Sequence, residues 1–158
     1  MTRLLPLALL LFACSEAEES VLLVAPHEVE FSWNPAFNER DDGMVAVVPI
    51  EVMVYDSESG LPRAAATIEL RGQGAVVLPQ DAVMFADPED DAALWDSWRD
   101  AFVQVDSHLV APAMALDTGE DGLIRFYALI DEVPGAGAEL GVIVTYDDLD
   151  ERIALRPR

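Results

Sequence analysis

The sequence predicts an all-β sandwich, and three observations lead to that prediction. From residue 21 onward, short apolar or alternating segments are separated by clusters of Gly, Pro, Asp and Asn, which is typical of strands in a two-sheet domain. The chain has 158 residues, and 52% of them are hydrophobic, which is enough for one good core. It has one cysteine, so no disulfide can form within it. We therefore expect a single domain.

Eight segments carry the strand pattern. Alternation is clearest at 67–71, where Ile68 and Leu70 lie between polar residues, and at 123–130. Such alternation places one face of each strand in a core. The eight predicted strands are 21–31, 45–55, 64–71, 75–78, 109–116, 123–130, 140–146 and 152–155.

One stretch departs from the β pattern. Within residues 90–103, the apolar residues Leu94, Trp95, Trp98 and Phe102 recur at helical spacing, and acidic residues precede them. The sequence therefore predicts one short α-helix at about 90–103, inside an insert that spans 84–116.

Trp95, Trp98 and Phe102 are candidate partner-binding residues. A helix face of this kind either covers the sandwich or is presented to a partner protein, whose groove would hold the aromatic side chains as anchors. The sequence leaves both interpretations open.

The N-terminal residues have the layout of a secretory signal peptide. Arg3 provides a positive charge, and residues 4–12 form an apolar run that is too short to span a bilayer. Leu11, Ala13 and Cys14 stand at the end of the signal peptide. This end resembles a lipobox, the motif at which lipoprotein signal peptidase cleaves before a lipid-modified cysteine.

The lipobox resemblance implies three segments and a location. The segments are a signal peptide at 1–13, a short acidic tether at 14–20 with the lipid on Cys14, and a domain at 21–158. The chain is then expected to be lipid-anchored in a bacterial cell envelope. An Asp directly after the lipid-modified cysteine is associated with retention in the inner membrane. This chain has Ser15 there, which favours the outer membrane. The protein is expected on either the periplasmic or the outer face of that membrane.

A second resemblance concerns the domain itself. A strand that ends at Asp56 is followed by Gly60-Leu61-Pro62 and by residues 65–70; Gly74 leads a middle strand, and 118–128 form a Gly-containing turn and a returning strand. In this order the motifs resemble an invasin/intimin-type bacterial Ig-like domain over roughly 45–155, apart from the insert. The resemblance implies an Ig-like β-sandwich with a non-catalytic binding or structural role.

The charge of the chain restricts its partners. There are 30 acidic and 9 basic residues, all nine of them arginine, and the net charge is −21. A protein this acidic is repelled by phosphate backbones, so we expect no nucleic-acid partner. The expected partners are the membrane, through the N-terminal lipid, and an envelope protein.

The chemistry-bearing residues do not suggest an enzyme. The only histidines are His27 and His108, and the motifs of the common hydrolases and of phosphate-binding loops are lacking. We expect no catalytic residues and no cofactor, with a small periplasmic enzyme as the weaker alternative.

Carboxylates in predicted turns offer a calcium alternative, in which the metal would stiffen the loops of an adhesin-like surface domain. Asp residues also favour turns through their own backbone hydrogen bonds, so solvated turns are the other interpretation. The calcium candidates are Asp117, Asp121, Asp147, Asp148 and Asp150.

Overall fold

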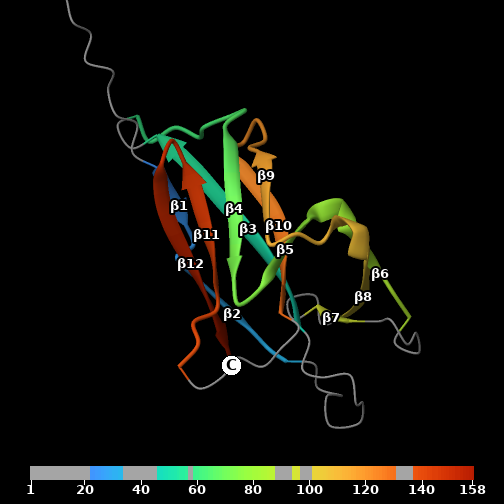
Figure 1. Ribbon diagram of the computed structural model, residues 1–158. Coiled ribbons are helices and arrows are strands. Elements are labelled where there is room, and N and C mark those ends of the chain that lie inside the picture. The colour runs from blue at the N-terminus through green and yellow to red at the C-terminus, as the bar shows by residue number, and fades with distance from the viewer. Residues whose placement is uncertain (1–21, 34–45, 57–58, 88–93, 97–100, 131–136) are drawn as a thin grey trace, which may run out of the picture.

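In the computed structural model, the described residues form two β-sheets that pack face to face (Figure 1). The described residues are 22–33, 46–56, 59–87, 94–96, 101–130 and 137–158. The predicted signal peptide and tether lie outside them. The strands are β1 (Leu22–Ala25), β2 (Glu28–Phe31), β3 (Ala46–Asp56), β4 (Thr67–Gln73), β5 (Val76–Pro79), β6 (Val83–Phe85), β7 (Leu94–Asp96), β8 (Ala101–Val105), β9 (Ala113–Asp117), β10 (Leu123–Ile130), β11 (Gly141–Tyr146) and β12 (Leu149–Pro157), with short 3₁₀ turns η2 (Gln80–Ala82) and η3 (Ser107–Leu109). The prediction of an all-β sandwich is confirmed.

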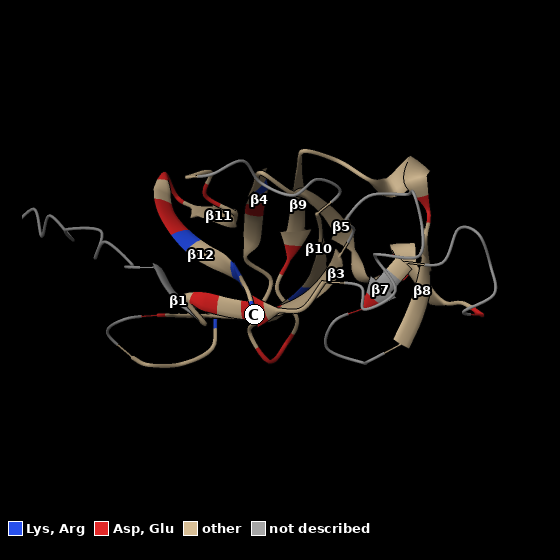
Figure 2. Ribbon diagram, turned by 90° about the horizontal axis from the view of Figure 1, so that it is seen from below, with Lys and Arg blue, Asp and Glu red and all other residues tan. Residues whose placement is uncertain are grey.

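The larger sheet is organised around β3. Its strand order is β5-β10-β3-β7-β8-β6, and β1 also pairs with β3. β10 pairs with one side of β3, from Ala46 to Met53. Two strands share the other side: β1 pairs with Met53 to Asp56, and β7 pairs in parallel with β3 at Val47. Seen from the C-terminal end of the molecule, β7 and β8 stand to one side of the packed sheets (Figure 2).

The smaller sheet has the strand order β2-β12-β11-β4-β9. β11 and β12 form a hairpin whose two turn residues, Asp147 and Asp148, have φ of 46° and 65°. Positive φ at both positions is the conformation of a type I′ turn, which suits the twist of a hairpin and which Asp tolerates better than most residues. The N-terminal segment is divided between the sheets, because β1 pairs with β3 and β2 pairs in parallel with β12.

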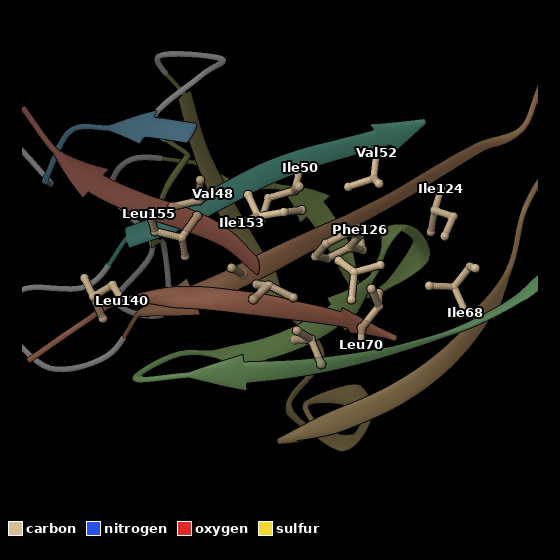
Figure 3. Close-up of a cluster of buried hydrophobic side chains, with 14 of the residues drawn as sticks. Val48, Ile50, Val52, Ile68, Leu70, Ile124, Phe126, Leu140, Ile153 and Leu155 are labelled. Carbon is tan, nitrogen blue, oxygen red and sulfur yellow. The ribbon is translucent and has the colours of Figure 1, made fainter. Parts of the chain in front are cut away.

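The main core fills the space between the two sheets. β3 contributes Ile50 and Val52, β4 contributes Ile68 and Leu70, and Phe126 of β10 lies among them, 1% exposed (Figure 3). Alternate residues of each strand point inward, as the period of two in the sequence predicts.

A second, smaller core lies on the outer face of the larger sheet. β3 begins with three consecutive buried residues, 46–48, and successive side chains point to opposite faces, so both faces are covered here. On the outer face, Val47, Leu78 and Tyr127 pack with Ala82 and Val103. The insert therefore covers an apolar patch of the sheet.

The predicted helix at about 90–103 is wrong. Its described residues form β7 and β8, which pair with each other in antiparallel register. Because β7 and β8 are short and close together in sequence, the apolar residues of the two strands recur at a spacing that resembles one face of a helix. Pairing with β3 and β6 satisfies the strand backbones, and Val103 becomes fully buried, so tertiary contacts outweigh the local pattern.

Most of the predicted strands are present with shifted ends. The segment 123–130 coincides with β10, whereas the predicted 21–31 divides into β1 and β2. Of the predicted 109–116, only 113–116 lie in a strand, β9. β6, β7 and β8 were not predicted as strands.

The two cores predict graded effects of truncation. Phe126→Ala should lower the free energy of unfolding by about 3–5 kcal/mol and Leu78→Ala, which leaves a cavity under the insert, by about 2–5 kcal/mol. Urea unfolding measures both. The matched control is Met84→Ala, at a side chain 59% exposed, which should change stability by less than about 0.5 kcal/mol. A Leu78→Ala effect as small as the control would mean that the second core is not packed.

Candidate functional site

Two of the three aromatic residues expected to bind a partner, Trp95 and Phe102, lie on paired strands and not on a helix. Trp95 of β7 is opposite Phe102 of β8 in the backbone register, and the side chain of Phe102 is half-buried. Trp98 lies outside the described residues. The helical presentation is corrected to two paired strands, and contact of these residues with a partner stays a prediction.

The acidic candidates for calcium lie toward one end of the molecule. β9 and β11 both pair antiparallel with β4, so they run in the same direction and end together, at Asp117 and at the turn of Asp147 and Asp148. Because β4 lies between them, these ends are two strand spacings apart, about 10 Å. In the part of the chain that the structure describes, no three His, Cys, Asp or Glu side chains form a group that could hold a metal ion.

Three of these carboxylates accept hydrogen bonds from nearby protein donors. The Thr67 hydroxyl donates to Asp117 Oδ1 over 2.6 Å. The Thr145 hydroxyl donates to Asp150, and the Leu123 N–H donates to Asp121 Oδ1 over 3.1 Å. The bond to Asp121 is a backbone bond within a turn, as the solvated-turn interpretation expects. Those to Asp117 and Asp150 instead join partners on paired strands.

A groove opens on the side of the sandwich where β9 and β10 border each other. It has a volume of about 340 Å³, and its lining includes Leu116 and Asp117 of β9, Leu123 of β10 and Asp81 of η2. β5 ends at Pro79, opposite Phe126, so residues 123–125 of β10 extend beyond β5 and line the groove.

Arg125 lies at the groove and is held by two carboxylates. Its Nε donates to Glu51 over 2.7 Å, and Nη2 lies 3.4 Å from Asp121 Oδ2. The hydrogen bond from the Leu123 N–H, followed by that from Arg125, lowers the pKa of Asp121, and the bond to Glu51 raises the pKa of Arg125. With this arginine paired, the exposed carboxylates of Asp81 and Asp117 leave the groove acidic.

Thr118 fastens the end of β9 to the preceding turn. The residue is 5% exposed. Its hydroxyl accepts from the Ala66 N–H over 2.9 Å and donates to the Arg63 carbonyl, and its own N–H donates to the Ala66 carbonyl over 2.9 Å. One buried side chain thus positions Asp117 and the wall of the groove.

Acidic residues are spread along the described strands and turns, with few basic positions among them (Figure 2). Several arginines are ion-paired with carboxylates, and the net charge of −21 already counts all nine arginines. These ion pairs are Arg125 with Glu51 and Asp121, Arg152 with Glu139, Arg156 with Glu28, and Arg158 with Glu30.

Two further findings concern the described residues. They include no helix of the length and apolarity needed to cross a membrane. The exposed histidines His27 and His108 lie apart in the fold, His27 between β1 and β2 and His108 in η3.

Sequence reasoning did not single out Thr118 or the groove. Thr118 stood in the sequence as one member of a turn motif, and its partners lie more than fifty residues earlier in the chain. The only local signal for the groove was the alternation of Met114 and Leu116 with small residues in β9.

No protein-family model, curated protein or solved structure matches this chain.

Thr118→Val should destabilise the protein by about 1–3 kcal/mol, because it keeps the shape of the side chain but leaves buried backbone groups of Arg63 and Ala66 without the hydroxyl. Thr118→Ser, which retains the hydroxyl, is the matched control and should lose less. Chemical denaturation of both variants measures the difference. Equal losses would indicate that the methyl group, and not the hydrogen bonds, matters.

Asp121→Asn should lower the melting temperature slightly at neutral pH. Since the pKa of Asp121 is lowered on folding, its ionised form adds stability that is complete above the ordinary value of 3.8 and is lost as the pH falls through the folded-state pKa. The difference from the unmutated protein should therefore vanish in acid. Glu120→Gln, at an exposed carboxyl of the same turn, controls for the loss of one charge, and thermal melts across pH measure both. A difference that persists in acid would contradict the assignment.

Proposed function

We propose that this protein is a lipid-anchored bacterial envelope protein whose single Ig-like module serves a non-catalytic binding or structural role. The main support for the proposal is that the module begins at one end of β3 and its insert lies near the other end. β1 starts at Leu22, opposite Asp56 at one end of β3, whereas the insert joins β3 at Val47, near the other end.

The strand order supports an Ig-like module. Ig constant-type domains place strands A, B, E and D in one sheet and C, F and G in the other. With β1, β3, β4, β5, β10, β11 and β12 taken in chain order as A to G, the larger sheet contains the neighbours β1-β3-β10-β5 and the smaller sheet β4-β11-β12. These are the ABED and CFG arrangements.

Several strands are additional to that pattern. β9 pairs with β4 at the edge of the smaller sheet, and β6, β7 and β8 belong to the insert. These additions distinguish this chain from a minimal Ig-like module and are where individual binding properties would reside.

The short link to the anchor sets the orientation of the module. Seven residues, 15–21, separate Cys14 from β1, and even fully extended they reach only about 25 Å. A lipid on Cys14 therefore keeps the Leu22 end near the membrane. Val47, where the insert joins, is nine residues along β3 from Asp56, about 30 Å further away. The insert then faces away from the lipid, where an envelope protein could reach it.

Cys14→Ala should abolish incorporation of labelled palmitate and move the protein from the membrane fraction to the aqueous fraction. More than one acyl chain is needed for stable anchoring, so loss of the modified cysteine should release essentially all of the protein. Metabolic labelling and fractionation in an enterobacterial host measure this.

Ser15→Asp is the matched control for that experiment, because it keeps the cysteine and alters only the residue associated with membrane sorting. It should keep the lipid and shift the protein toward the inner membrane. Unchanged fractionation of Cys14→Ala, with no label on the unmutated protein, would refute the lipid anchor.

A further inference from the structure

The two edges of the smaller sheet differ in how they are protected. Natural edge strands are shielded by charge, proline or cover against pairing with another chain. At one edge, the glutamates of β2 are ion-paired with Arg156 of β12 and with Arg158, which follows β12. At the other edge, β9 has the sequence Ala-Met-Ala-Leu-Asp, with Ala113 and Ala115 exposed. Within the described ranges, nothing gives β9 a comparable charged shield along most of its length.

The backbone groups that β9 turns outward can be assigned from its hydrogen bonds. The Thr118 N–H donates to the Ala66 carbonyl over 2.9 Å, so Thr118 is a hydrogen-bonded pair with β4. In an antiparallel ladder, hydrogen-bonded pairs alternate with non-hydrogen-bonded pairs, so the next hydrogen-bonded pair contains Leu116. The N–H and C=O groups of Ala115 and Asp117 therefore point away from β4. Among the described residues, β9 is the last strand of its sheet.

The side chains around this edge have a matching period of two. Leu116 points inward and, with Leu123, lines the groove, which continues beside the edge. Asp117 also borders the groove, but its side chain lies on the opposite, outer face of β9. Glu69 of the neighbouring β4 shares that face and is also exposed. A strand laid along β9 would meet Leu116 and Leu123 at the groove, which Asp81 also lines, and carboxylates on its outer face.

We propose that the edge of β9 at Ala115 and Asp117 binds an extended segment of a partner protein in which basic and apolar residues alternate. The segment adds to the smaller sheet as a further strand, with backbone hydrogen bonds to these two residues. Its apolar side chains face Leu116 and Leu123, and its basic side chains face Asp117 and Glu69.

Charge selects this occupant over a second copy of the chain. Two copies, each with a net charge of −21, would bring the same carboxylates together at the edge. A basic segment instead pairs with them. The inference deepens the proposed binding role and rests on it, but it does not depend on the lipid at Cys14.

The test uses the full-length ¹⁵N-labelled protein in detergent and a blocked six-residue peptide of alternating lysine and valine. At saturating peptide, amide hydrogen exchange at Ala115 and Asp117 should slow by about tenfold or more, whereas Leu116, already bonded to β4, should change little. A peptide of alternating glutamate and valine, and one with the lysines and valines in separate blocks, should bind at least about tenfold more weakly.

A pair of variants at one position separates the backbone from the side chain. Ala115→Pro removes an outward N–H, which an edge strand tolerates, and should weaken peptide binding about tenfold or more; Ala115→Val keeps that N–H and should bind as the unmutated protein does. If Ala115→Pro does not fold, the exchange data on the unmutated protein decide the question.

Three results would overturn the proposal. They are unchanged exchange at Ala115 and Asp117 with millimolar peptide, equal binding of the glutamate peptide, and protection of β9 by self-association without peptide. Because neither the peptide nor the amide readout involves Cys14, such a result would leave the lipid anchor standing, and loss of the anchor would leave this binding unchanged.

Discussion

The structure depends on the need to bury both faces of one strand. β3 pairs with β10, β1 and β7, and its first residues, 46–48, are buried on both sides of the sheet. A sandwich covers one face of each sheet and leaves the other to water. Val47, on the outer face, would expose an apolar patch together with Leu78 and Tyr127 unless something else covered it. The insert supplies that cover, so it is part of the folded unit and not a loop added to a finished domain.

The two edges of the smaller sheet are held in different ways, which bears on the binding proposed for β9. Ion pairs from β12 hold β2 along one edge. At the other, hydrogen bonds of Thr118 fix the end of β9, whose residues Leu116 and Asp117 line the groove. A rigid edge is a better binding surface than a mobile one, because less conformational entropy is lost when a partner segment is ordered on it.

Sequence patterns predicted the features that depend on neighbouring residues and missed those that depend on residues remote in the chain. The strand at 123–130 was predicted with the observed ends, because the alternation that marks it also buries one face against the main core. The placement of Asp147 in a turn follows from its own backbone preferences. The helix at 90–103 was wrong because its backbone partner, Val47 of β3, is remote in sequence. The groove depends on where β5 ends relative to β9 and β10, which no single segment encodes.

The direction of β1 has a mechanical consequence. β1 begins at the end of the sandwich nearest the proposed anchor and runs antiparallel to β3 toward the end where β7 joins. A pull between the membrane and a partner held on the insert would act along these two strands. The hydrogen bonds between them would then share the load simultaneously, instead of opening one after another as in a hairpin pulled apart from its ends. A module anchored in this way would therefore resist tension along the direction of β1 and β3.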